Sequence, residues 1–210
     1  MKINLKMVRV MQHDFYEAKA FEEGGKKTFS GTFRIEPDSD NDKLIRKALK
    51  EVSAAKWADK APGILKMALA KNSGKEVCYW EGDTKEYDGY AGGMILTTKR
   101  DTVKVQQFTN PDGTTETFIG PLLLNKDKTR IKTDVGTLYR GCYVNVSVDI
   151  WPQENKWGKT MRCELLGVQK AKDGDAFAAG STTDATDFDD LSDLSDLSDS
   201  GDSGDGEDLA

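Results

Sequence analysis

The sequence predicts a mainly β domain, either a small Greek-key barrel or a sandwich, with one helical insertion and an acidic tail. Several apolar-alternating runs are separated by turn residues, which is typical of such folds. A stretch with helical spacing follows the first strands. Residues 181–210 contain eleven acidic residues and no basic ones. We therefore expect a folded domain over residues 1–177 and a tail over 178–210. We expect the tail to be disordered, since uniform charge and low hydrophobicity cannot offset the entropy of ordering.

The first part of the chain predicts two strands and two helices. Residues 1–15 alternate apolar and polar side chains, and residues 28–36 place Phe29, Phe33 and Ile35 on one face. The spacing then becomes helical over about 38–56, where aspartates before Lys43 are suited to cap the start. Pro62 begins a shorter helix at 63–71, so the helical insertion covers about 38–71. A basic helix face lies off the apolar stripe and is either solvated or in contact with nucleic acid; it consists of Lys43, Arg46, Lys47 and Lys50.

From Tyr90 onward the pattern indicates strands. Residues 94–98 form one candidate, and residues 103–108 and 114–119 flank the hairpin-turn sequence Asn110-Pro111-Asp112-Gly113. Longer strands are expected at 140–151 and 160–170. The intervening residues 152–159 are expected to form a polar loop.

The charge balance indicates a polyanionic partner. The chain has 30 Lys+Arg and 36 Asp+Glu, and eleven of the acids lie in residues 181–210, which leaves 30 bases against 25 acids in residues 1–180. A basic body tied to an acidic tail suits binding of another polyanion, with the tail competing for the same surface. We expect a soluble, intracellular protein, because no apolar run approaches the ~20 residues of a membrane span and no signal peptide is apparent.

The outward face of residues 140–151 combines aromatic and small polar side chains. Val144, Val146 and Val148 point into the core, whereas Tyr143 and Trp151 point outward, with Tyr139 in line before them. This mixture suits a platform on which bases stack. The alternative is a half-exposed face that a loop or another subunit covers.

Basic and aromatic residues are interleaved along this part of the chain, as in proteins that bind single-stranded nucleic acid. The expected stacking residues are Tyr90, Tyr139, Tyr143, Trp151 and Trp157. The expected phosphate contacts are Lys99, Arg100, Lys104, Arg140, Lys159 and Arg162.

The acidic tail contains a three-residue Asp-Leu-Ser repeat over residues 190–198. Its apolar residues are candidate docking points on a partner protein, and the alternative is a tail that only increases solubility. The candidate contacts are Phe188, Asp190, Leu191, Asp193, Leu194, Asp196 and Leu197.

Enzymatic chemistry has little support in the sequence. The single histidine, His13, is isolated, no nucleophile motif stands out, and the three cysteines lack metal-ligand spacing. We therefore expect no catalytic residues, metal or cofactor. Two alternatives stay open: a metal-dependent nuclease using Asp149 and Glu164, and a protein-binding scaffold module whose basic face meets an acidic protein.

Five segments together resemble the bacteriophage single-stranded DNA-binding protein family. They are Tyr87-Asp88-Gly89-Tyr90-Ala91-Gly92, Arg140-Gly141-Cys142-Tyr143-Val144-Asn145, Trp157-Gly158-Lys159 with Leu166-Gly167-Val168-Gln169-Lys170, and Lys172-Asp173-Gly174-Asp175-Ala176-Phe177.

The resemblance implies an OB fold that binds single-stranded DNA during phage replication, recombination or repair in the cytoplasm of an infected bacterium. It also implies a tail that recruits replication proteins, such as a polymerase or helicase, and shields the DNA groove, and it makes a homodimer plausible. Tails of this kind often finish with an aromatic residue, whereas this one finishes Glu207-Asp208-Leu209-Ala210.

Overall fold

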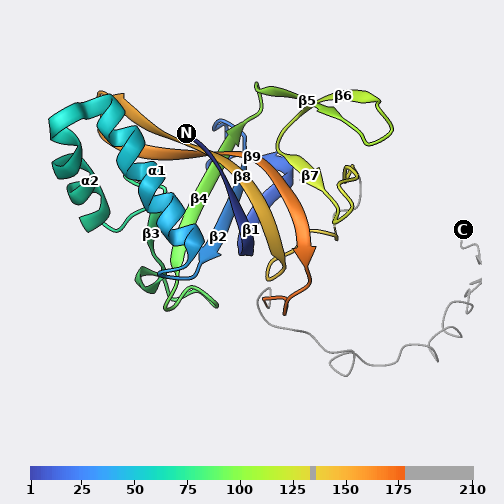
Figure 1. The fold of residues 1–210 in the computed structure, drawn as a ribbon, viewed down its shortest axis with the longest axis horizontal. Coiled ribbons are helices and arrows are strands. Elements are labelled where there is room, and N and C mark those ends of the chain that lie inside the picture. The colour runs from blue at the N-terminus through green and yellow to red at the C-terminus, as the bar shows by residue number, and fades with distance from the viewer. Residues whose placement is uncertain (133–135, 178–210) are drawn as a thin grey trace, which may run out of the picture. The chain divides into compact units, whose positions relative to one another are not determined.

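Five strands form a barrel in the computed structural model, which describes residues 1–132 and 136–177. They are β1 (Lys2–Lys19), β2 (Thr28–Ile35), β4 (Met94–Asp101), β8 (Tyr143–Asn155) and β9 (Gly158–Lys172). Their hydrogen-bonded order is β4-β2-β1-β8-β9, and a single parallel pair, Lys99 with Glu164, joins β9 back to β4 (Figure 1). A five-stranded, partly open Greek-key barrel is an OB fold. The mainly β fold class and the OB fold are thereby confirmed.

Alternation along the strands separates the barrel interior from its outer surface. In β2 the residues Phe29, Gly31, Phe33 and Ile35 are buried, and the residues between them are half-buried. In β8 the inward face is Val144, Val146, Val148 and Ile150. This agrees with the period of two read from the sequence.

The helical insertion consists of α1 (Asp40–Trp57), η1 (Ala58–Lys60) and α2 (Ala61–Ala70), between β2 and β4. Ser39, rather than an aspartate, caps α1, because its hydroxyl accepts a hydrogen bond from the backbone N–H of Asp42. The Asp42 side chain instead accepts hydrogen bonds from the Tyr79 hydroxyl and the Arg46 Nε, at 2.8 and 2.6 Å. None of the helices among the described residues is long and apolar enough to span a membrane.

Shorter strands extend this framework. β3 (Tyr79–Glu81), which continues into η2 (Gly82–Thr84), pairs with β4, and β7 (Leu122–Leu124) pairs with β9. β5 (Val105–Thr109) and β6 (Thr115–Ile119) form a separate hairpin around the predicted 110–113 turn. Figure 1 shows this hairpin on the opposite side of the barrel from α1 and α2.

The predicted polar loop at 152–159 is wrong. β8 continues through Pro152 to Asn155 and turns directly into β9 at Gly158. Proline is tolerated there because the Ile150 N–H bonds to Met1 at the start of the chain. The nitrogen of Pro152, two residues on, faces the same side. It lies past Lys2, the first residue of β1, so it takes no part in the hydrogen bonds between β1 and β8. The result is a long two-stranded arm that reaches toward the helices, where the Trp57 Nε1 donates to Glu154 Oε2 at 3.0 Å.

Candidate nucleic-acid interface

A groove of about 300 Å³ lies where β4 and β9 close the barrel. Because these strands pair at only one position, their outer surfaces diverge and leave a hollow. β4 supplies Thr97, Lys99 and Asp101. The other lining residues are Thr28, Gly74, Cys78, Lys104, Trp151, Gln153, Arg162, Cys163 and Glu164. The groove therefore combines an aromatic ring, cations and small polar groups.

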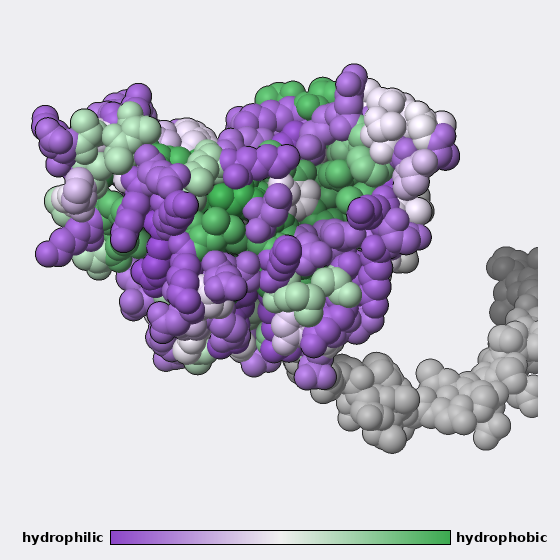
Figure 2. All heavy atoms as spheres, viewed as in Figure 1, coloured by the Kyte–Doolittle hydropathy of each residue, from purple (hydrophilic) through white to green (hydrophobic). Residues whose placement is uncertain are grey.

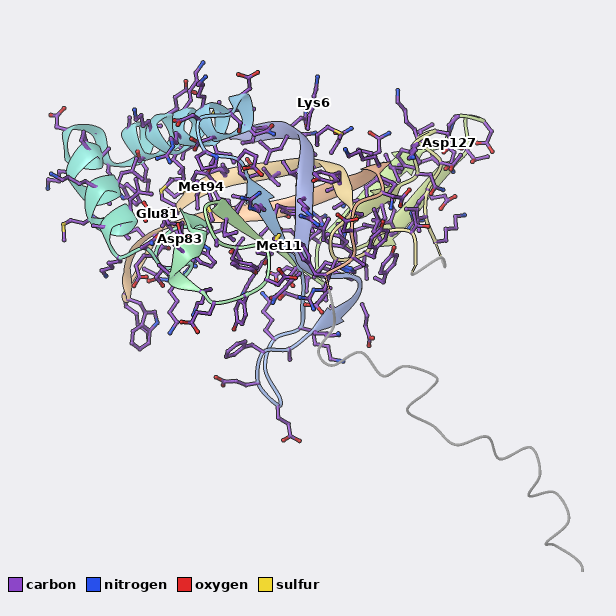
Figure 3. All side chains as sticks on the ribbon, turned by 90° about the horizontal axis from the view of Figure 1, so that it is seen from below. Lys6, Met11, Glu81, Asp83, Met94 and Asp127 are labelled. Carbon is purple, nitrogen blue, oxygen red and sulfur yellow. The ribbon has the colours of Figure 1, made fainter. Side chains whose placement is uncertain are left out.

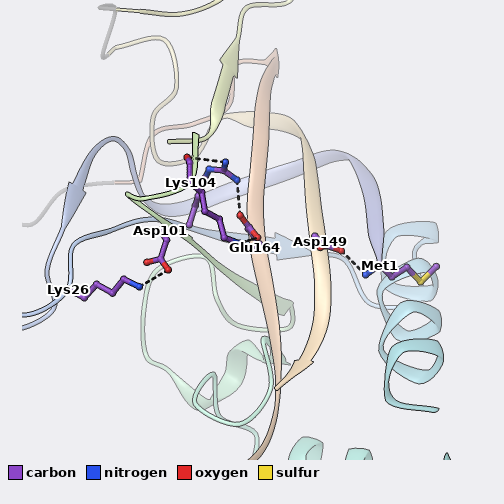
Figure 4. Close-up of polar contacts among 7 residues, drawn as sticks. Met1, Lys26, Asp101, Lys104, Asp149 and Glu164 are labelled. Carbon is purple, nitrogen blue, oxygen red and sulfur yellow. Dashed lines mark hydrogen bonds and ion pairs between the residues drawn. The ribbon is translucent and has the colours of Figure 1, made fainter. Parts of the chain in front are cut away.

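Several cations at the groove are paired with carboxylates (Figure 4). Lys26 forms an ion pair with Asp101 at 2.6 Å. Glu164 forms ion pairs with both Arg100, at 2.8 Å, and Lys104. Lys99 and Arg162 differ, because no carboxylate of the described residues lies within ion-pair distance of either. Arg162 Nε donates to the Gln153 amide oxygen at 2.9 Å. Positive charge thus exceeds negative charge along the groove, as binding of a phosphate backbone requires.

Two hairpin tips beside the barrel carry exposed aromatic rings. Trp157, at the β8–β9 turn, is 83 % exposed, with Lys156 Nζ 4.9 Å from its ring centroid. Phe21, in the connection between β1 and β2, is 94 % exposed. In OB folds the loops between strands 1 and 2 and between strands 4 and 5 flank the oligonucleotide-binding face, and these two tips occupy those positions. Trp157 is one of the predicted stacking residues, whereas Phe21 was not predicted. Its signal was an aromatic residue within the polar run 17–27.

Of the predicted residues, Lys99, Lys104, Trp151 and Arg162 line one groove. Lys159 lies on the adjoining arm, where it contacts Glu154 at 3.6 Å. Arg100 lies beneath the groove, is 4 % exposed and is held by Glu164, so a direct phosphate contact does not agree with its position.

The other predicted residues lie elsewhere. Tyr143 and Trp151 are eight residues apart on β8, roughly 26 Å along a strand. Tyr90 is 4 % exposed and packs with Met11, Trp80, Ile95 and Phe177 in a second apolar cluster. The expectation that Tyr90 offers an open stacking surface is therefore wrong for this structure. Its ring belongs to a core.

Tyr139, Arg140 and Tyr143 surround the last described residues, 173–177, which we call the C-terminal strap. The Tyr139 hydroxyl donates to Asp173 Oδ1 at 3.0 Å, and the Phe177 N–H donates to the Arg140 carbonyl at 3.3 Å. Arg140 Nε itself donates to the Met11 carbonyl at 3.0 Å. The Tyr143 ring lies near the Lys172 ammonium, 4.7 Å from its centroid. The Tyr139 hydroxyl and the Arg140 backbone carbonyl thus hold the strap against the barrel.

Two glycines from the recognised segments make this close contact possible. A Cβ on Gly89 would lie 2.5 Å from the Phe177 ring, and a Cβ on Gly141 would lie 2.1 Å from the Asp175 carbonyl oxygen. Both glycines have positive φ. Three segments that carry the family resemblance, 87–92, 140–145 and 172–177, thus meet at the strap rather than in the groove.

The outward face of β8 does not form one stacking platform. Asn145 and Ser147 line a separate hollow of about 310 Å³ with Leu122 and Leu124 of β7. Asp149 receives the amino group of Met1 at 2.6 Å. Figure 2 shows apolar side chains gathered in a hollow on the face that β8 and β9 present in Figure 1. Only the Trp151 end of the predicted platform opens into the groove.

The carboxylates considered for metal binding have other partners. Asp149 and Glu164 are cross-strand neighbours, but each is paired with a cation. A further pair of carboxylates, Glu81 at the end of β3 and Asp83 in η2, lie close together (Figure 3), and Asp83 accepts the Gly92 N–H. Within residues 1–132 and 136–177, no group of three or more His, Cys, Asp or Glu side chains is placed to hold a metal ion. The predicted tail contacts, Phe188 to Leu197, lie outside the described residues.

Sequence and structure comparisons identify relatives of the chain. Residues 1–198 match the profile of a family described as the ssDNA-binding protein of Enterobacter phage Enc34. The chain belongs to this family. It is also similar to the protein p50 of Acyrthosiphon pisum secondary endosymbiont phage 1, at 31 % identity over 182 residues, covering 86 % of this chain and 88 % of p50.

Two solved structures share the fold. One is the single-stranded DNA-binding protein from bacteriophage Enc34 in complex with ssDNA, with a TM-score of 0.63 and 20 % identity, covering 84 % of this chain and 89 % of that one. The other is gp2.5, a single-stranded DNA-binding protein encoded by bacteriophage T7. It has a TM-score of 0.51 and 13 % identity, covering 87 % of this chain and 98 % of that one.

Proposed function

We propose that this protein binds single-stranded DNA, without strong sequence preference, along the groove at the β4–β9 closure. The observation that carries the proposal is the convergence of Trp151, Lys99 and Arg162 in one groove. The exposed rings of Trp157 and Phe21, in the β8–β9 and β1–β2 connections, add to it. A relative with the same fold was solved with ssDNA bound, which supports the same ligand class here.

The groove chemistry suits unpaired nucleotides. Lysine and arginine side chains neutralise phosphates, and each stacked base contributes about 1–3 kcal/mol on an aromatic ring. Paired bases cannot stack on Trp151 or Trp157, because their faces are already covered by neighbouring base pairs. Thr28, Thr97 and Gln153 add hydrogen-bonding groups that suit any base edge or sugar. This is binding chemistry, and we propose no catalytic step.

Family membership also supports a role in phage DNA replication, recombination or repair, in the cytoplasm of the infected host. In this proposal the acidic residues of the tail compete with DNA for the groove, and the tail recruits replication proteins such as a polymerase or helicase. A homodimer is compatible with these roles.

A fluorescence titration tests the DNA proposal, since Trp151 and Trp157 report on the groove and its adjoining arm. The full-length protein is titrated with oligothymidine and with a duplex of equal length at the same salt concentration. We expect strong quenching and tighter binding with the single strand. Equal affinity for the two ligands would reject the proposed mode, and absence of binding to both would favour a protein-binding role for the basic surface.

A further inference from the structure

One carboxylate at the groove is shared by two cations that differ in accessibility. Glu164 is 12 % exposed; its Oε1 contacts Arg100 Nη1 at 2.8 Å, and its Oε2 contacts Lys104 Nζ. The Arg100 side chain is 4 % exposed and that of Lys104 is 51 % exposed. Figure 4 shows Lys104 against Glu164.

The two ion pairs differ in how readily they break. Separating a buried pair leaves an uncompensated buried charge, which is strongly unfavourable. The Lys104–Glu164 pair breaks more readily, because water solvates the half-exposed Lys104 ammonium when it leaves and Glu164 keeps its contact with Arg100. Lys104 can therefore leave Glu164 at low cost, whereas Arg100 stays.

Arg100 also fixes the backbone that carries Lys104. Its Nη2 donates to the Lys104 carbonyl oxygen at 3.4 Å, within the turn that leads from β4 to β5. Glu164 thus orients Arg100, and Arg100 in turn holds the Lys104 backbone at the groove wall. When the Lys104 ammonium moves away, the Arg100 guanidinium still compensates the Glu164 charge.

We propose that Glu164 is a positioning residue that holds Lys104 at the groove in the free protein and releases it to a DNA phosphate on binding. The inference rests on the proposed function, because it requires a single strand in the groove. It assigns the two cations distinct roles: Lys104 exchanges a carboxylate for a phosphate, and Arg100 remains the permanent partner of Glu164.

Salt dependence of binding tests this exchange in the full-length protein. Oligothymidine affinity is measured across a salt series for the wild type, Lys104→Met and Lys104→Arg. Each phosphate contact contributes about 0.7 to the slope of log K against log salt for single strands. We expect Lys104→Met to bind more weakly with a slope shallower by about 0.7, and Lys104→Arg to keep the wild-type slope.

The chain contains a matched control outside the groove. Glu116 accepts Arg130 at 2.6 Å and Lys132 at 2.7 Å, which is the same arrangement of one carboxylate, one arginine and one lysine. Lys132→Met should leave the slope unchanged. If Lys104→Met also leaves the slope unchanged while the wild type binds, Lys104 stays on Glu164 and the inference is overturned.

A second pair of variants tests the part played by Glu164. Glu164→Gln should raise affinity at low salt by up to about fivefold, since Lys104 no longer has a competing carboxylate. The gain should vanish in the Lys104→Met background, and an equal gain there would contradict the inference. Melting curves verify that each variant folds. If Glu164→Gln does not fold, the salt slopes of Lys104→Met and Lys104→Arg test the inference. A wild type that fails to bind oligothymidine would instead refute the proposed function.

Discussion

Burial, rather than residue type, decides which aromatic side chains in this domain can contact nucleotides. Tyr90 and Trp151 were both predicted to stack on bases, because each is an aromatic residue near basic ones. Tyr90 nevertheless lies in the apolar cluster, whereas Trp151 is 38 % exposed in the groove. The difference arises from Ile95 and Trp80, which extend an apolar surface over the outer side of β4 at one end only. The other end of the same strand remains open.

Substitution of the groove tryptophan should therefore weaken DNA binding selectively. We expect Trp151→Ala to reduce affinity for oligothymidine by roughly 5- to 150-fold, because one stacked base contributes about 1–3 kcal/mol. Tyr90→Phe should leave the affinity unchanged. Fluorescence anisotropy of a labelled oligonucleotide measures both variants. An unchanged affinity for Trp151→Ala would place the stacking surface elsewhere.

His13 should make the stability of the domain depend on pH. Burial lowers the pKa of His13 below its ordinary value of 6.5; Asp14 acts in the opposite direction, and Arg140 and Lys19 lower it further. The unfolded chain therefore binds a proton at higher pH than the folded chain does. Stability should be fully retained above pH 6.5 and should fall as the pH decreases from there toward the folded-state pKa.

Urea unfolding between pH 7 and pH 5 checks this expectation. The midpoint should drop in the wild type and should change less in His13→Gln, because His13 is the only histidine in the chain. An identical pH dependence in both proteins would show that other groups control stability in this range.

At the scale of elements, one buried carboxylate fastens α1 to the barrel. Burial alone would raise the pKa of Asp42, but hydrogen bonds from Tyr79, the Asp38 backbone and Arg46 outweigh that effect and hold the pKa below its usual value. Asp42 sits in the first turn of α1, and Tyr79 belongs to β3. This contact fixes the first turn of α1 relative to β3, and the bond from Trp57 to Glu154 joins the last residue of α1 to β8.

Removing this carboxylate should destabilise the fold. We expect Asp42→Ala to lower the free energy of unfolding by about 3 kcal/mol, because the buried Tyr79 hydroxyl loses its acceptor and Arg46 loses its partner. Glu51→Ala is the control, since Glu51 is exposed and lies 3.7 Å from Lys47 in a surface pair worth no more than about 0.5 kcal/mol. Chemical denaturation compares the two, and equal losses would contradict the anchoring role.

The C-terminal strap should likewise contribute to the stability of the barrel. Phe177 packs in the apolar cluster, and the Arg9 guanidinium lies 4.2 Å from its ring centroid. We expect Phe177→Ala to cost about 3 kcal/mol through the lost burial and the cavity left behind. Phe21→Ala makes the same chemical change at an exposed ring and should leave the melting temperature nearly unchanged. If Phe177→Ala leaves the melting temperature unchanged, the Phe177 ring does not hold the strap.

Local patterns predicted the elements well, because each depends on neighbouring residues. The period of two identified β2 and β8, and the turn chemistry of 110–113 identified the β5–β6 hairpin. Pro152 was misleading, since its place in a strand depends on where β1 begins, 150 residues away in sequence. The strap was not predicted for the same reason: its contacts join residues 89, 141 and 177.

At the scale of the whole molecule, the site depends on how the barrel closes. The sequence predicted a site made of rings and cations from the β region, but it could not separate the groove from the strap, because both include outward residues of β8. The ion pairs could not be predicted from the sequence either. Glu164 neutralises Arg100 and Lys104 only because β4 and β9 meet at one position. Local charge patterns therefore overestimate how many cations are free to bind phosphate.

The charge of the tail predicts that the tail weakens DNA binding at low salt. Deleting residues 181–210 removes eleven acids and no bases, which changes the formal net charge from −6 to +5. A tethered polyanion has a high effective concentration at any surface that it can reach, so the proposed competition for the groove predicts that its removal tightens binding of oligothymidine. The gain should be largest at about 0.01 M salt and small at about 0.15 M, because the screening length falls from roughly 30 Å to 8 Å.

A salt series with the full chain, the truncated chain and a variant with neutral amides in place of the eleven acids measures this effect. The truncated and neutral-tail proteins should bind alike and more tightly than the full chain at low salt. If the neutral tail still weakens binding, bulk rather than charge limits access to the groove. If all three proteins bind equally, the tail acts only on partner proteins or on solubility and does not compete with DNA for the groove.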